Sequence, residues 1–147
     1  MSHVRQQIRE RVGTILTGLS TTGNNVYQSR VYALNESNLP ALVIYTKSET
    51  SNADVIGSTI GLARELTLVV EAYVKVNSNF DDVVDTICAE VETAMANDRK
   101  LNGTAKFNHL ESTDIEFNGE GENPVGVATM NFVVQYRTIT NAPETAV

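Results

Sequence analysis

The sequence predicts an α+β fold, in which a single four-stranded sheet, mostly antiparallel or mixed, carries two helices packed on one face. Two amphipathic helical stripes and four segments of strand-like periodicity support this prediction. They follow one another as helix, strand, strand, helix, strand, strand, and helices on one face would bury both stripes. With 147 residues, the chain has about the length of one domain. We expect residues 1–140 to form that domain and residues 141–147 to form a flexible tail.

Apolar residues at steps of three and four predict each helix. The first helix is expected over residues 2–18, with Ser2 as its N-cap and Gly18 at its end. Its stripe consists of Val4, Ile8, Val12, Ile15, Leu16 and Leu19. The second is expected to begin after Ser78 or Asn79 and to end near residue 97. Its stripe consists of Phe80, Val83, Val84, Ile87, Val91, Ala94 and Met95.

Four runs predict the strands, and a short extended piece, "VYQSRVYAL", precedes them. The runs are "LPALVIYTK", "RELTLVVEAYVKV", "HLESTDIEF" and "VGVATMNFVVQYRTI". The second run alternates most clearly, since one face is wholly apolar from Leu66 to Val76. With the helices on the apolar faces, the other sheet face would carry Val69, Tyr73, Val127 and Val133. So many apolar groups suit a surface that a partner buries.

The segment "SETSNADVIGSTIGLA", residues 48–63, is a long polar stretch between two predicted strands. Hairpin connections usually take two to five residues, so we predict a flexible contact arm that orders against another protein subunit. The alternative is a surface loop without a role. Arg64 at its base is a candidate donor for an intersubunit ion pair, although Glu65 and Glu71 are nearby. The proposed interface residues in this region are Asp54, Val55, Ile56, Ile60, Leu62 and Arg64.

The charge balance argues against direct recognition of nucleic acid. The formal net charge is −7, from 11 basic and 18 acidic residues, and duplex binding requires clustered Lys and Arg. An acidic chain suits a passage through which DNA slides without sticking. Acidic residues also gather in one predicted hairpin: Glu111, Asp114, Glu116, Glu120 and Glu122. They form either a solvated edge or a rim, including the interface candidates Glu120 and Glu122, that meets a basic partner or faces DNA in transit.

Nothing in the sequence favours catalysis, a cofactor or a bound metal. Nucleophilic catalysis requires a nucleophile that is positioned beside a base, and His3, His109 and a predicted buried Cys88 do not favour such an arrangement. Asp81, Asp82 and Asp85 suit the positive end of a helix dipole better than a hard-metal site.

Neither of the two glycine-containing patterns predicts a ligand site. Asp114, Glu116, Asn118 and Gly119 begin like a calcium loop, but Val125 occupies the twelfth position, where Glu is needed. Gly119 and Gly121 open no predicted helix, so they form no dinucleotide fingerprint. We also expect no signal peptide and no membrane partner, because no apolar run approaches the ~20 residues that span a bilayer.

An ordered series of segments resembles one known family. The series is "NVYQSRVYALNESNLPALVIYTKSE", "ARELTLVVEAYVKV", "DDVVDTICAEVETAM", "DRKLNG" and "ATMNFVVQYRT". It is similar to the tail-terminator, or tail-completion, family of long-tailed bacteriophages, of the minor tail protein U type. The resemblance implies a homo-oligomeric ring, commonly of six copies, on the last ring of the tail tube. It also implies three partners, namely sister copies, the major tail tube protein and a head-completion or connector protein, with DNA passing through the middle.

The leading hypothesis is therefore a structural protein of the virion, assembled in the host bacterial cytoplasm and located at the head-proximal end of the tail. It would terminate tail polymerisation and provide the surface for head joining. One alternative is a head-completion or neck protein of the same virion. The other is a small-molecule-binding regulatory domain, which two helices on a four-stranded sheet can also build and which would need a pocket with convergent polar groups.

Overall fold

The computed structural model describes residues 2–28, 39–75, 79–117 and 125–147 and shows an α+β fold with one mixed sheet. The sheet has five strands in the order β1-β2-β3-β5-β4, in which β1 runs parallel to β2 and every other pair is antiparallel. The helices are α1 (Val4–Leu16) and α2 (Phe80–Asn97). The strands are β1 (Val26–Tyr27), β2 (Ala41–Val55), β3 (Gly61–Lys75), β4 (Phe107–Phe117) and β5 (Val125–Ile139).

The predicted number of four strands was wrong, because the extended piece before β2 contributes a fifth. Its first residues pair with β2, Val26 with Leu42 and Tyr27 with Val43. The remainder of that piece from residue 29 to residue 34 lies outside the described residues. Two residues of pairing carry no periodicity, so this short strand could not be distinguished from a loop in the sequence.

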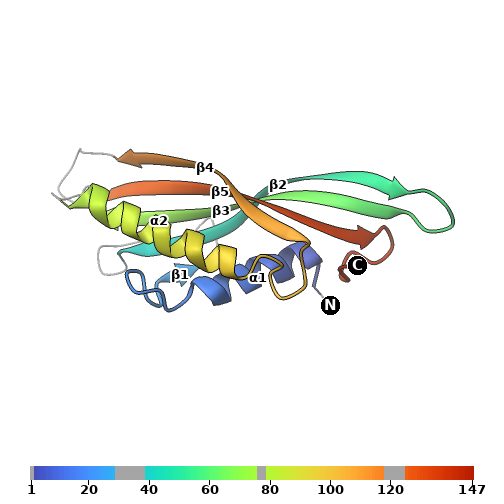
Figure 1. Ribbon diagram of the computed structural model, residues 1–147, viewed down its shortest axis with the longest axis horizontal. Helices are drawn as coiled ribbons and strands as arrows, with labels where there is room; N and C mark the ends of the chain where they lie inside the picture. Colours follow the sequence, from blue (N-terminus) through green and yellow to red (C-terminus); the bar gives the residue numbers. More distant parts are fainter. Residues whose placement is uncertain (1, 29–38, 76–78, 118–124) are drawn as a thin grey trace.

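Both helices cover the same face of the sheet, as predicted. They lie next to each other along part of the sheet, and the hairpin formed by β2 and β3 continues beyond them (Figure 1). One apolar core fills the space between the two layers. Its sheet side includes the faces predicted for β3 and β5: Leu66, Leu68, Val70, Ala72 and Val74 on β3, and Ala128, Met130, Phe132, Val134 and Tyr136 on β5. Val76 lies outside the described residues.

The ends of α1 differ from the prediction. The helix begins at Val4, and the N-cap is His3, whose Nδ1 accepts a hydrogen bond from the Arg5 amide at 3.0 Å. Ser2, the predicted cap, lies one residue earlier. The helix ends at Leu16, and Gly18 follows with φ of +90°, a conformation that favours glycine. The Gly18 amide then bonds to the carbonyl of Gly23 at 2.8 Å, which closes a tight loop.

The cap at His3 predicts a pH dependence of stability. Burial, and next the charges of Arg5 and Arg64, lower the pKa of His3 from its usual 6.5. The neutral ring is therefore favoured in the fold, so its stabilising contribution is complete above pH 6.5 and declines as pH falls through the lowered pKa. We expect His3→Asn, which keeps an N-cap acceptor, to lose less stability than the natural protein between pH 7 and pH 5. Urea unfolding at the two pH values measures this, and equal losses would contradict it.

Residues 141–147, for which we expect a flexible tail, make hydrogen bonds to α1 and β5. The amide of Val4 donates to the carbonyl of Pro143 at 2.9 Å, and the Gln7 side chain donates to the carbonyl of Glu144 at 2.8 Å. The amide of Val147 donates to the carbonyl of Arg137 at 2.9 Å. The first of these bonds satisfies the amide of Val4 at the start of α1. No local sequence pattern reveals such contacts between distant segments.

Helix α2 matches its prediction, and one side chain of β4 completes its C-terminal end. Asn108 is 7% exposed, and its Nδ2 donates to the carbonyls of Met95, Asp98 and Arg99, at 3.4, 3.4 and 2.9 Å. Carbonyls at a helix end have no partner within the helix. The side chain of Asn108 therefore ties the last turn of α2 to the edge of the sheet.

Segment 48–63 is not the flexible loop that we predicted. Strand β2 runs to Val55 and β3 starts at Gly61, so only residues 56–60 connect them. The ladder continues through Ser51 with Arg64 and Ala53 with Leu62, with one irregularity near each end. Both faces of this hairpin extend past the helices into water, so its strands lack the alternation of apolar and polar residues that identifies a half-buried strand.

Candidate assembly surfaces

A polar cluster braces the base of the β2–β3 hairpin, with Glu49 at its centre. Its carboxylate accepts from Arg5 at 2.7 Å and from Arg64 at 3.0 Å on one oxygen, and from the Tyr136 hydroxyl on the other. The side chains of Glu49 and Arg64 are only 9% and 11% exposed. Burial, and next the bond to Glu49, raise the pKa of Tyr136. Helix α1 and strands β2, β3 and β5 thus meet at one carboxylate.

The structure gives Arg64 partners within its own chain. We expected it to donate to another subunit or to Glu65 or Glu71, but its guanidinium bonds to Glu49 and, through Nε, to Thr138 at 2.9 Å. A nearly buried cation needs partners within its own chain. The role of Arg64 in the structure is therefore to fix the hairpin.

A second ion pair holds the outer part of the hairpin. Arg137 on β5 forms a bidentate ion pair with Asp54. Its Nε donates to Oδ2 at 2.7 Å, and its Nη2 donates to Oδ1 at 3.0 Å. The bond from Arg137 holds the pKa of Asp54 below its usual value. Asp54, proposed as an interface residue, is therefore already paired within the chain, and its charge is neutralised next to the tip.

Gly61 provides the room for this pair, which leads to a second prediction. A Cβ atom at Gly61 would overlap the guanidinium of Arg137 and the carboxylate of Asp54, whereas a Cβ at Gly57 in the same turn would meet nothing. Both overlapping groups end flexible side chains, so we expect Gly61→Ala to fold but to displace the ion pair. Amide hydrogen exchange in residues 53–63 should become faster in Gly61→Ala and stay unchanged in Gly57→Ala. Equal exchange in the two variants would contradict this role of Gly61.

The tip of the hairpin exposes aliphatic side chains. Val55, Ile56 and Ile60 are 51%, 87% and 37% exposed, and we call them the tip residues. The predicted interface residue Leu62 is half-buried and pairs across the ladder with Thr138 and Ala53. The tip residues are thus the part of the predicted contact segment that remains free to meet another molecule.

The sheet face opposite the helices carries an apolar patch that the described residues do not cover with any helix or strand. This outer-face patch consists of Val43, Tyr45, Val69, Tyr73, Val127 and Val133. The side chains of Val43, Val69 and Val133 are buried, and those of Tyr45, Tyr73 and Val127 are half-buried. The strand register places them on the side away from the core, as predicted for the four of them on β3 and β5. Within the patch, burial and next Glu71 raise the pKa of Tyr73 to about 12, and its hydroxyl contacts Glu71 at 3.3 Å. The Tyr73 hydroxyl therefore stays protonated at physiological pH, beside the carboxylate of Glu71.

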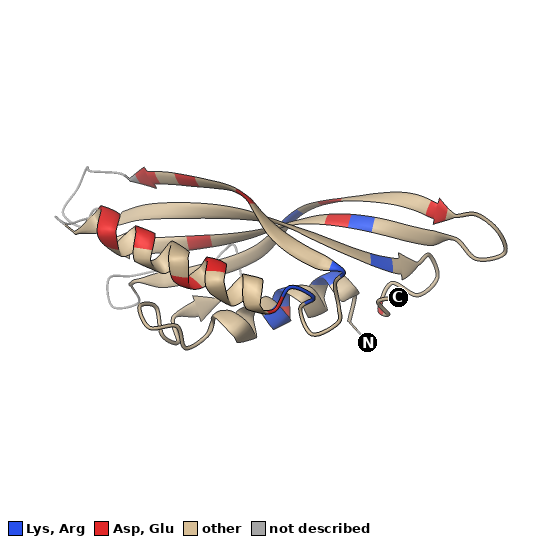
Figure 2. Ribbon diagram, in the orientation of Figure 1, with Lys and Arg blue, Asp and Glu red and all other residues tan. Residues whose placement is uncertain are grey.

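Acidic and basic residues are distributed unevenly over the molecule (Figure 2). Along α2 and at the far end of β4 the coloured residues are acidic, whereas Lys and Arg gather near the end of α2 and the base of the hairpin. Glu111, Asp114 and Glu116 on β4 are exposed. Glu120 and Glu122 lie outside the described residues.

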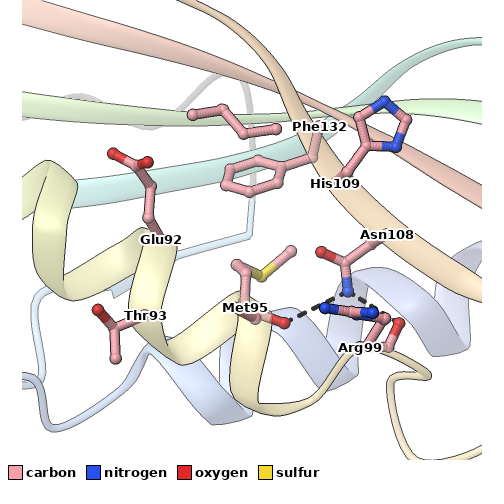
Figure 3. A pocket seen from close by; sticks show the side chains of 9 residues that line it. Glu92, Thr93, Met95, Arg99, Asn108, His109 and Phe132 are labelled. Atoms are coloured by element: carbon pink, nitrogen blue, oxygen red, sulfur yellow. Dashed lines mark hydrogen bonds between the residues drawn. The ribbon is translucent and has the colours of Figure 1, made fainter.

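A hollow of about 390 Å³ lies between the end of α2 and β4 (Figure 3). Met95 and Phe132 form its apolar wall, and Glu92, Arg99 and His109 stand around its rim. The amide group of Asn108 is engaged with the end of α2 and does not serve a ligand. This arrangement lacks the convergent free polar groups that the regulatory-domain hypothesis requires, within the part of the chain that the structure describes.

The residues that were considered as candidates for catalysis, Cys88, His3 and His109, lie apart from one another. Cys88 is buried in the core, and burial, followed by Glu92 and Asp85, raises the pKa of its thiol. His109 stacks near Phe107, with ring centroids 6.1 Å apart, while His3 caps α1. Among the described residues, no three His, Cys, Asp or Glu side chains are grouped to hold a metal ion. None of the helices in the described part of the chain is long and apolar enough to cross a membrane.

The residues that hold the hairpin in place were not predicted from the sequence. Glu49 is 87 residues from Tyr136 and Asp54 is 83 residues from Arg137, and the pairing of β2 with β3 and of β3 with β5 brings each pair together. The one available signal was that the polar segment contains two acids, Glu49 and Asp54, and is followed by strands that contain arginines.

Comparisons with known proteins identify one family for this chain. Residues 3–136 match the model of the family described as phage minor tail protein U. A search of curated proteins found no match. Among solved structures, a chain from the virion of a native gene transfer agent particle shares 10% sequence identity, with a TM-score of 0.41. That likeness covers 90% of this chain and 92% of the other, and it is too distant to carry a functional argument.

Proposed function

Because this chain belongs to the phage minor tail protein U family, we propose that it closes into a ring on the end of the tail tube, stops further tube growth and offers the surface to which the head joins. The subunit is then structural and has no catalytic role. Its partners are sister copies, most simply six, the major tail tube protein and a head-completion or connector protein.

The observation that carries this proposal is the apolar tip of the β2–β3 hairpin, which stays exposed in the single chain. The tip residues project from a hairpin that two ion pairs hold in place. Contiguous exposed apolar surface on a soluble protein marks an interaction site. A braced hairpin also loses little conformational freedom on binding, which favours affinity.

Termination follows from the geometry of such a ring. One side of the ring matches the tube end, and the other side differs from it, so that no further tube subunit can add. The net charge of −7 suits a central hole through which DNA slides, because an acidic wall repels phosphates. The head-joining protein then binds the side away from the tube.

Electron microscopy of particles assembled without this protein tests the proposal. Headless tails of uncontrolled length are the expected result, and supplying the protein afterwards should restore a uniform length. Tails of normal length with unjoined heads would contradict termination and would favour the role of a head-completion or neck protein.

A further inference from the structure

We propose that the subunits of the ring join edge to edge, with the outer half of β2 in one copy pairing with β4 of the next copy, so that one sheet continues across the contact. This inference rests on the proposed function and specifies which strands meet. The paired segments are Ser48–Ala53 on β2 and Ser112–Phe117 on β4, and the occupant of the β2 edge is a second copy of this chain.

The outer half of β2 is an open edge of the sheet. Strand β1 pairs only with Leu42 and Val43, and no other described strand adjoins β2 on that side. Residues 50–55 are exposed and lie where the hairpin continues beyond the helices (Figure 1). An edge strand presents a row of backbone N–H and C=O groups that can pair with the strand of another chain.

The chain itself covers the opposite edge of this outer region. The pairing of β4 with β5 ends where Phe107 lies opposite Gln135. Beyond that point the amide of Val147 donates to the carbonyl of Arg137 at 2.9 Å, so the C-terminal residues lie along the edge of β5. Within the described residues, the edge that remains available to a further strand in this region is therefore that of β2.

The β2 edge lacks the free charges that keep edge strands from pairing. Among residues 48–53 the single charged side chain is that of Glu49, and Arg5 and Arg64 bind its carboxylate. The ladder with β3 is also regular through these six residues, between the two irregularities of β2. A neutral and regular edge of this kind suits the addition of a strand.

Strand β4 lies at the other side of the sheet, and its properties complement those of β2. Its ladder with β5 is regular from Ser112 to Phe117, which is also six residues. Asp114 and Glu116 within this segment are exposed. Like charges that face each other across strands are destabilising, so two β4 edges repel each other, whereas the neutral edge of β2 can accept β4.

Exposed apolar side chains mark the same two strands. The described part of the chain exposes six large apolar side chains, and five of them lie on β4 or at the tip of the β2–β3 hairpin. Those on β4 are Phe107 and Ile115, which are 36% and 47% exposed. Pairing of β4 with β2 brings Ile115 against the hairpin and removes apolar surface from water on both partners.

A contact between two different strands joins the copies head to tail. A pair of copies still has a free β2 edge at one end and a free β4 edge at the other. Such heterologous contacts continue until the last copy meets the first, which produces a ring if the rotation closes. The tube then binds a side of the ring formed by other residues.

A charge reversal across the contact tests the inference. The strand register places Thr50, Asn52, Asp114 and Glu116 on the sheet face away from the core. Every copy in a ring turns the same face toward the axis, so these side chains meet on one face of the continued sheet. The edge variant, Thr50→Glu with Asn52→Glu, therefore places acids against acids. The rescue variant adds Asp114→Lys and Glu116→Lys to the same chain, so that opposite charges meet again.

A matched control adds the same two charges elsewhere. It is Thr14→Glu with Thr93→Glu, at exposed positions on α1 and α2. Circular dichroism and thermal melting establish that each variant is folded, and native mass spectrometry gives the size of the assemblies.

We expect the natural protein, the control and the rescue variant to form rings. The edge variant should associate at least about a hundredfold more weakly, because like charges are then juxtaposed at every contact. A rescue variant that stays monomeric would overturn the inference, since that result is expected if two β2 edges pair with each other. Rings from the edge variant, loss of rings in the control, or natural protein that stays monomeric at millimolar concentration would overturn it as well.

Binding to purified tube ends distinguishes this inference from the proposed function. Rings of the rescue variant and of the natural protein that leave tube ends bare would keep the edge contact and overturn the role in termination. An edge variant that forms rings and caps tubes like the natural protein would keep that role and overturn the edge contact.

Discussion

Replacing Glu49 with Ala is expected to lower the free energy of unfolding by about 3 kcal/mol, because it leaves the nearly buried guanidinium of Arg64 without its carboxylate partner. The same change removes the acceptor for Arg5 and for the Tyr136 hydroxyl. We also expect the β2–β3 hairpin to open locally, so that proteases cut residues 48–63 faster. Urea unfolding and limited proteolysis measure the two effects.

Two matched variants sharpen this prediction. Glu65→Ala removes an exposed acid next to Arg64, and its effect should stay within about 0.5 kcal/mol, as for most surface changes. Glu49→Gln keeps an oxygen for the hydrogen bonds and should cost less than Glu49→Ala. A cost for Glu49→Ala no larger than that for Glu65→Ala would show that the cluster does not hold the hairpin.

Replacing Asn108 with Asp is expected to be about as damaging, with a loss of about 3–5 kcal/mol at neutral pH. The substitution places a carboxylate, which cannot donate, against the carbonyls of Met95, Asp98 and Arg99 in a site that is 7% exposed. Burial raises the pKa of such a carboxyl above its unfolded value of about 3.9. The cost relative to the natural protein should therefore be largest at neutral pH and decrease in acid, as protonation restores a donor.

The neighbouring position supplies the control for Asn108. His109 lies next on β4 and is exposed, so His109→Asp should change the free energy of unfolding by less than about 1 kcal/mol. Thermal or urea unfolding between pH 4 and pH 7 gives the pH dependence. A cost of Asn108→Asp that does not change with pH would contradict the assignment of its amide as the donor to the end of α2.

Much of the layered fold could be predicted from the sequence, because the core-facing residues repeat with the period of their element. The faces of β3 and β5 and the stripe of α2 were assigned this way, as was the sharing of one sheet face by both helices. The short strand β1 was not, since two residues cannot show a period. The cap of α1 at His3 and the docked C-terminal residues also depend on contacts between distant parts of the chain.

The apolar residues of the hairpin tip could be recognised in the sequence, but the contacts that hold the hairpin in place could not. Val55, Ile56 and Ile60 stood out as apolar residues in a polar segment, and the structure leaves them exposed at the tip. Their rigid setting was not visible, because it depends on Arg137 reaching Asp54 across 83 residues of sequence. Arg64 was expected to pair with another subunit or with Glu65 or Glu71, and the fold pairs it with Glu49, which is 15 residues away in the sequence.

We propose that the exposed surfaces of this subunit are filled only when sister copies close around a hole at the end of the tail tube. The most direct measurement is electron microscopy of purified tail tubes mixed with the concentrated protein. We expect a single ring at one end of each tube, and no further growth of the tube when tube protein is added. Tubes with bare ends that continue to lengthen, beside protein that stays monomeric, would contradict it.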